Sequence, residues 1–81
     1  MEYKFSLDDG VVYCNGEPLK YVVQATHDYV NKVVISNGEA RDVFDHANYS
    51  SKRDSFYTFG DQQAPGSLVR EALARLIVGG L

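Results

Sequence analysis

The chain has 81 residues, of which 44% are hydrophobic and 23% are charged, and its formal net charge is -3 at pH 7. This composition is too apolar and too weakly charged for a disordered chain, and the length suits a single small globular domain over residues 1–81. The negative charge disfavours generic binding to nucleic acid, because an acidic surface repels phosphate backbones on average.

The cysteine content and the apolar runs indicate the cellular compartment of the protein. Cys14 is the only cysteine, so no disulfide can form within the chain, and a reducing compartment is favoured. No apolar run approaches the roughly 20 residues that a membrane-spanning helix needs. The first ten residues, MEYKFSLDDG, lack the apolar stretch of a secretion signal. We therefore expect a cytoplasmic protein with no membrane partner and no cofactor.

The first 14 residues predict a β-hairpin. Residues 2–7 alternate between polar and apolar side chains, which is typical of a half-buried strand. Asp8, Asp9 and Gly10 then form a turn signal, because glycine adopts positive φ at little cost. Residues 11–14, VVYC, read as the second strand of the pair.

Residues 15–18, NGEP, interrupt the chain, and residues 19–36 fit two interpretations. Their apolar residues form one helical stripe, with Pro18 at the first helical position and Asn37-Gly38 at the C-cap. Their β-branched residues and tyrosines fit strands instead. A repeat favours strands, since VVYCNGE at residues 11–17 has a near twin, VVISNGE, at residues 33–39. On that interpretation residues 39–44, EARDVF, form a further strand, and the helical alternative stays open.

The last third of the chain predicts a loop, a strand, a second loop and a helix. Residues 45–54 are polar and rich in turn formers, residues 55–59 alternate like a strand, and residues 60–66 again suggest a loop. Residues 67–78 predict an amphipathic helix that begins with Ser67 as the N-cap and ends before Gly79-Gly80. Its apolar stripe consists of Leu68, Val69, Ala72, Leu73, Leu76 and Ile77.

Together these elements predict the α+β class: a small antiparallel sheet, made of the N-terminal hairpin and later strands, packed by the C-terminal helix 67–78. The stripe on that helix is broad. It could cover the sheet and still leave an apolar edge for a second copy of the chain, so a homodimer through this helix is one expectation.

The best candidate for recognition is an aromatic and basic loop. It combines Tyr49, Lys52 and Arg53 with Phe56 and Tyr57, side chains that are typical of protein-binding hot spots and that could also stack on bases and meet phosphates.

An acidic patch offers a second candidate. It combines Asp8, Asp9, Asp42 and Asp45, which could meet a basic partner on the opposite surface.

The sequence gives weaker support to a catalytic or metal-binding function. Cys14 could act as a nucleophile only with His27 or His46 within hydrogen-bond reach, and nothing in the spacing places them together. The adjacent pairs His27-Asp28 and Asp45-His46 suit divalent metals by residue type, but neighbours on a strand point to opposite sides. Phosphate-binding, zinc and serine-hydrolase motifs are absent from the sequence.

The sequence therefore favours a small non-enzymatic protein that binds another protein as an accessory, regulatory or inhibitory factor, of the kind that phages and mobile elements encode. A nucleic-acid-binding module that uses residues 49–59 is the first alternative. A small metal-dependent hydrolase is the second.

Overall fold

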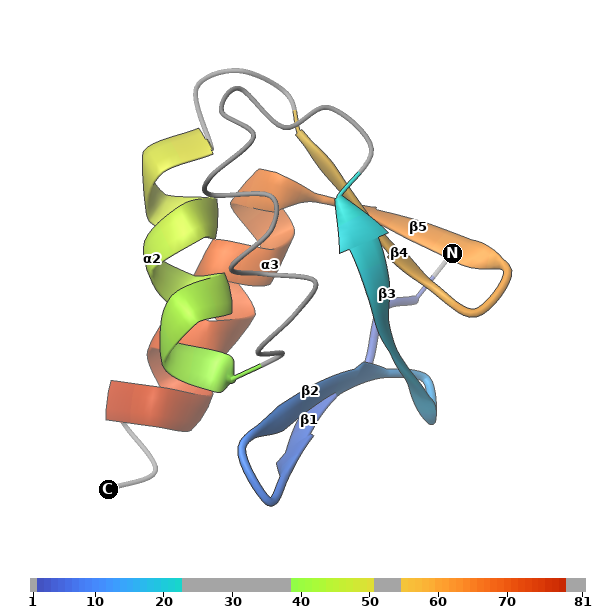
Figure 1. The fold of residues 1–81 in the computed structure, drawn as a ribbon, viewed down its shortest axis with the longest axis horizontal. Coiled ribbons are helices and arrows are strands. Elements are labelled where there is room, and N and C mark those ends of the chain that lie inside the picture. The colour runs from blue at the N-terminus through green and yellow to red at the C-terminus, as the bar shows by residue number, and fades with distance from the viewer. Residues whose placement is uncertain (1, 23–38, 51–54, 79–81) are drawn as a thin grey trace.

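The structure is a computed structural model that describes residues 2–22, 39–50 and 55–78. Five antiparallel strands form one sheet in the order β1-β2-β3-β4-β5, and two helices, α2 and α3, lie side by side next to it (Figure 1). This arrangement confirms the predicted α+β class. The elements are β1 (Phe5–Asp8), β2 (Val11–Cys14), β3 (Glu17–Val22), α2 (Ala40–Ser50), β4 (Phe56–Phe59), β5 (Gln62–Pro65), α3 (Gly66–Leu73) and a π-helical continuation, η2 (Ala74–Val78).

Two tight turns build the N-terminal part of the sheet, and both have the sequence signature of a type I′ hairpin. Asp9 and Gly10 have φ of 53° and 79° between β1 and β2, and Asn15 and Gly16 have φ of 54° and 84° between β2 and β3. Two successive positive φ values match the right-handed twist of the flanking strands. The predicted hairpin is thus confirmed, and the first Asn-Gly of the repeat is a hairpin turn.

β3 bends the sheet. Its first residues pair with β2, its later residues pair with β4, and the register with β4 shifts between Leu19 and Tyr21. Such an irregularity increases the local twist. The sheet therefore curls until the Phe5 ring of β1 meets the Phe59 ring of β4 edge to face, with centroids 5.9 Å apart.

The strand prediction begins too late in this region. Residues 17 and 18, expected to be part of a break, already belong to β3. The helical alternative for residues 19–36 is wrong for its first turn, since Leu19–Val22 is in a strand, and the remainder of that segment and Asn37-Gly38 lie outside the described residues.

The predicted strand at residues 39–44 and the first half of the predicted loop at residues 45–54 are wrong. Apart from Glu39, both regions belong to α2, while residues 51–54 lie outside the described residues. The buried positions of α2 recur every three or four residues, as helical packing requires. Four of them are alanine, histidine or serine, so the apolar stripe is faint in the sequence. The buried residues of α2 are Ala40, Val43, His46, Ala47 and Ser50.

Tertiary contacts anchor the start of α2. Glu39 forms an isolated antiparallel bridge with Val11, and the Ala40 backbone N–H donates to the Gly10 carbonyl at 2.6 Å. Glu39, the last residue of the second Asn-Gly-Glu, therefore makes one bridge to β2, and the helix begins at the next residue.

The strand at residues 55–59 is confirmed as β4, whereas the loop at residues 60–66 is largely wrong because it contains β5. β5 pairs with β4 from Phe59↔Gln62 to Phe56↔Pro65 and leads directly into α3. The helix begins at Gly66 and its N-cap is Pro65, which has no side-chain cap, so Ser67 does not have the predicted capping role.

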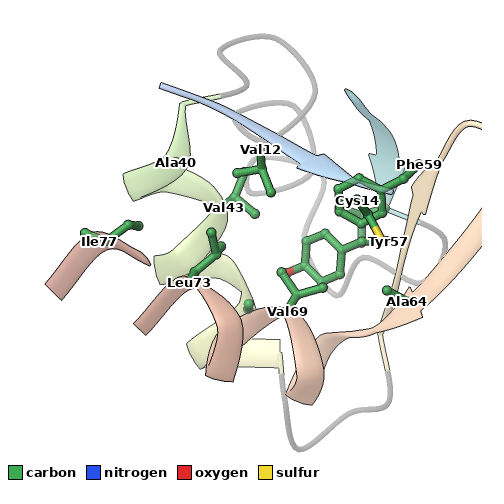
Figure 2. Close-up of a cluster of buried hydrophobic side chains, with 12 residues drawn as sticks. Val12, Cys14, Ala40, Val43, Tyr57, Phe59, Ala64, Val69, Leu73 and Ile77 are labelled. Carbon is green, nitrogen blue, oxygen red and sulfur yellow. The ribbon is translucent and has the colours of Figure 1, made fainter. Parts of the chain in front are cut away.

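The core lies between the concave face of the sheet and the two helices. Val69, Leu73 and Ile77 from the C-terminal helical segment belong to the same buried cluster as Val43 of α2 and side chains from the strands (Figure 2). The predicted stripe on residues 67–78 divides here. Val69, Leu73 and Ile77 are buried, Ala72 and Leu76 are half-buried, and Leu68 remains 39% exposed. The buried core residues are Val12, Cys14, Val22, Ala40, Val43, Ala47, Tyr57, Phe59, Ala64, Val69, Leu73 and Ile77.

Candidate functional site: a groove between β1 and α3

An open apolar groove lies between the first strand and the C-terminal helix. It contains a hollow of about 360 Å³ and a second of about 210 Å³ with largely the same lining. We call it the β1–α3 groove, and its lining residues are Tyr3, Phe5, Leu68, Glu71, Ala72, Arg75 and Leu76.

The strand side of the groove is aromatic. Residues 2–8 alternate in exposure, so that Tyr3, Phe5 and Leu7 are half-buried and pack against the core while the residues between them are exposed. The Tyr3 and Phe5 rings stack with centroids 6.3 Å apart and an interplanar angle of 22°. Phe5 also rests edge to face on the buried Phe59 ring, which fixes its orientation. This wall is therefore held in place before any partner binds.

The helix side is formed by the part of the apolar stripe that the core does not cover. Leu68 and Ala72 are one helical turn apart and share a face, which continues to Leu76. Leu73, one position along from Ala72, is fully buried in the core. The helix thus uses one apolar strip for folding and leaves a second, adjacent strip at the surface.

The charges of the groove neutralise each other. The Arg75 guanidinium contacts the Glu71 carboxylate at 2.8 Å, and the two side chains are 76% and 59% exposed. An exposed pair of this type contributes little to stability, about 0.3–0.5 kcal/mol. Its main effect is that the described residues that line the groove have no net charge.

The backbone of β1 adds hydrogen-bonding groups beside the groove. β1 is the first strand in the sheet order, and β2 is its only neighbouring strand among the described elements. The Asn15 N–H donates to the Lys4 carbonyl at 2.8 Å, which makes Lys4 and Asn15 a hydrogen-bonded pair. Because such pairs alternate along an antiparallel ladder, Ser6 and Asp8 also direct their backbone groups toward β2. The N–H and C=O groups of Phe5 and Leu7 then point to the outer edge.

Asn15 holds this edge in place. Its side-chain oxygen accepts from the Lys4 N–H at 2.9 Å, and its amide nitrogen donates to the Glu2 carbonyl at 3.0 Å and to Gln62 Oε1 at 2.9 Å. Asn15, which belongs to the repeated Asn-Gly-Glu motif, therefore links Glu2 and Lys4 to the β2–β3 turn and to Gln62 of β5.

Of the residues that the sequence proposes for partner binding, those that the structure describes lie on two elements. Asp42, Asp45 and Tyr49 lie on α2, where Tyr49 is 48% exposed, while Phe56 and Tyr57 lie on β4. Lys52 and Arg53 lie outside the described residues. The expected exposure of Tyr57 is wrong, since its side chain is fully buried. β4 is flanked by β3 and β5, and the Tyr57 face of the strand is covered by the helices.

Tyr57 belongs to a buried polar network with α2. The Tyr57 hydroxyl is hydrogen-bonded to His46 Nδ1, and the Ser50 hydroxyl lies 3.1 Å from His46 Nε2. A neutral imidazole donates at one nitrogen and accepts at the other, so both hydroxyls can be satisfied at once. Burial lowers the pKa of His46 and raises the pKa of Tyr57. Both effects favour neutral forms, which suits a structural network inside a core.

This network bears on the proposed metal and thiol chemistry. The two nitrogens of His46 face hydroxyls in the core, whereas the Asp45 side chain next to it is exposed, so the two do not converge on one site. Among the described residues, no three histidine, cysteine or acidic side chains lie close enough to hold a metal ion. Cys14 is fully buried, and burial raises the pKa of its thiol. His27 and Asp28 lie outside the described residues.

The sequence predicts the apolar faces to which Tyr3, Phe5, Leu68, Ala72 and Leu76 belong, but it does not indicate that they line a groove. The signal was the width of the apolar stripe, which was interpreted only as a homodimer edge. The alternation of residues 2–7 places Tyr3 and Phe5 together on the apolar face of a half-buried strand.

Comparison with protein-family models, with curated proteins and with solved structures finds no match to this chain. Within the described part of the chain, no helix has both the length and the apolar character needed to cross a bilayer. The geometry of the groove is therefore the basis for a functional argument.

Proposed function

We propose that this chain is a small non-enzymatic binding protein that holds an apolar segment of a partner protein in the β1–α3 groove. The observation that supports this proposal is the second apolar strip of α3. Leu68 stays 39% exposed beside a preordered aromatic pair, although the core has already buried Val69 and Leu73. An apolar patch that folding leaves uncovered and that adjoins a concave surface is typical of protein-interaction sites.

The role as an accessory, regulatory or inhibitory factor in the cytoplasm remains part of this proposal. No observation on the described residues favours nucleic acid over protein, since the groove is neutral and Tyr57 is buried. The nucleic-acid and metal-hydrolase alternatives therefore stay predictions of the sequence, as does the homodimer.

Site-specific photocrosslinking tests the proposal. A benzoylphenylalanine in place of Tyr3 puts the reactive group on the groove wall, and the same residue in place of Tyr21, which is 47% exposed on β3, is the matched control. In the cells that produce the protein, we expect a discrete protein adduct from position 3 and a much weaker one from position 21.

Two substitutions on α3 test whether the position-3 adduct depends on the apolar lining of the groove. Leu68→Asp should abolish the position-3 adduct, because it puts a charge into the apolar lining, whereas Ser67→Asp at the exposed neighbouring position should preserve it. The proposal is wrong if position 3 crosslinks no better than position 21, or if the adduct survives Leu68→Asp.

A further inference from the structure

We infer that the partner segment binds to the outer edge of β1 as an additional extended strand, with every second side chain placed in the β1–α3 groove. The inference rests on the proposed function, because it specifies how a partner is held at the same site. It follows from the way the edge and the groove share residues.

The backbone part of the inference comes from the ladder between β1 and β2. The Asn15 to Lys4 hydrogen bond and the Ser6↔Tyr13 and Asp8↔Val11 register leave the backbone groups of Phe5 and Leu7 on the outer edge. A strand added there would satisfy up to four donors and acceptors on these two residues. Extended peptides are commonly held at sheet edges by such main-chain bonds, and pockets for alternate side chains supply their selectivity.

The side-chain part comes from the position of the groove. A new strand continues the sheet about 4.8 Å beyond β1, and its side chains alternate between the two faces. Those on the same face as Tyr3 and Phe5 would point toward Leu68, Ala72 and Leu76 of the helical wall. The larger hollow of about 360 Å³ lies at the small end of ligand pockets. It is sized for one or two side chains rather than for a folded domain.

The charged residues that line the groove determine which class of partner side chain it can accept. Glu71 and Arg75 neutralise each other at 2.8 Å, so the lining that the structure describes offers no counter-charge to an acidic or basic side chain. Burying an unpaired charge there is unfavourable, and an apolar side chain is favoured. The opposite face of β1 has exposed Lys4, Ser6 and Asp8, so the intervening residues of the partner can be polar. The expected ligand is a peptide with apolar residues at alternate positions.

A second copy of this chain fits the site less well. The apolar residues on its own β1, Phe5 and Leu7, already pack against its core, and Phe5 contacts Phe59. They are therefore not available to enter the groove of another molecule. The apolar side chains of a separate extended peptide are not already packed in a core.

Selection from a phage-displayed library of random 12-residue peptides against the immobilised full chain tests the inference. We expect the recovered sequences to share apolar residues two positions apart. A synthetic peptide of the recovered consensus then serves as the probe in isothermal titration calorimetry.

The decisive measurement is an N-methyl scan of that peptide. Methylation of a peptide nitrogen removes a backbone donor and leaves the side chain in place. If the peptide pairs with β1, methylation should weaken binding about tenfold at alternate positions and less than about twofold between them, because only alternate N–H groups face the edge. Because the scan uses the unmodified protein, it does not depend on a variant that folds.

The possible results distinguish strand pairing at the edge of β1 from binding in the groove as such. Binding that is lost with Leu68→Asp but shows no alternation in the N-methyl scan, or apolar positions spaced by three and four, would refute strand pairing and leave groove binding intact. Self-association of the chain that competes with the peptide would replace the partner segment with a second copy. A library that yields no binder, or binders insensitive to Leu68→Asp, would contradict the proposed function itself.

Discussion

The buried network around His46 predicts that the protein loses stability in mild acid. His46 is 2% exposed, and its two described partners, the hydroxyls of Tyr57 and Ser50, carry no charge that could stabilise an imidazolium. Burial lowers the pKa of His46 from an ordinary value of 6.5. Between these two pKa values the unfolded chain binds a proton that the folded protein does not bind. The stability that the neutral His46 contributes is therefore fully present well above pH 6.5. It is lost as the pH is lowered through 6.5 toward the folded-state pKa.

The size of the effect has an upper bound. One histidine can change the free energy of unfolding by at most about 1.4 kcal/mol per pH unit. If His46 stays neutral in the folded state, the loss between pH 7 and pH 5 approaches about 2 kcal/mol for an unfolded-state pKa of 6.5. In a domain of this size each kcal/mol lowers the melting temperature by about 4–8 °C.

Urea denaturation followed by far-UV circular dichroism measures the effect at half-unit steps from pH 7.5 to pH 5. His27, the only other histidine, is replaced by glutamine in every protein that is compared, so that one imidazole titrates. The test variant is His46→Gln, whose amide can still donate and accept a hydrogen bond but does not titrate in this range. We expect the slope of stability against pH between 6.5 and 5 to be steep with His46 and nearly flat with His46→Gln.

The comparison of slopes is independent of any overall loss of stability in the variant. Carboxylates contribute to both proteins equally, and mostly at lower pH. Equal slopes in the two proteins would refute the argument, as would a His46 NMR titration with a midpoint at or above 6.5.

Three further predictions concern stability and use the same denaturation assay. Gly60→Ala should destabilise the fold by about 1 kcal/mol or more, since Gly60 has φ of 62° and an added Cβ would lie 2.6 Å from Glu17 Cγ. Part of that loss should return in the Glu17→Ala background, and equal losses in both backgrounds would show that the steric contact is unimportant. Thr58→Val should stabilise the protein by about 1 kcal/mol, because the buried Thr58 hydroxyl has no hydrogen-bond partner among the described residues; a loss of stability would contradict this. Leu73→Ala should cost about 2–5 kcal/mol while Leu68→Ala costs under about 1 kcal/mol, and similar losses would show that Leu68 belongs to the core rather than to the groove.

Sequence and structure agree that residues 67–78 are helical, but not on everything that the surface of this helix does. The amphipathic pattern on residues 67–78 correctly indicated a helix that docks on the sheet. It could not show how the stripe divides into a core strip and a groove strip. That division depends on how closely α2 and β1 approach the helix, and neither distance is encoded in the periodicity of one segment.

The misassigned elements share a physical cause. α2 buries alanine, histidine and serine, which give little apolar signal, and its burial of His46 depends on hydroxyls supplied by its own last residue and by β4. β5, with the sequence QQAP, has almost no strand propensity of its own and is formed by pairing with β4. In both cases tertiary contacts override a weak local preference.

The sequence by itself determined the local reversals and the two best-patterned kinds of element. Asp9-Gly10 and Asn15-Gly16 reverse the chain because few other residue pairs adopt successive positive φ values cheaply, and alternation or helical periodicity marks the strands and the helix beside them. The tertiary structure alone decided that α2 is a helix, that Tyr57 is buried, and that Tyr3 and Phe5 meet Leu68 across a groove. These outcomes join residues more than ten positions apart, and in the groove more than sixty. They are set by the curl of the sheet and by long-range packing, which no short segment of the chain specifies.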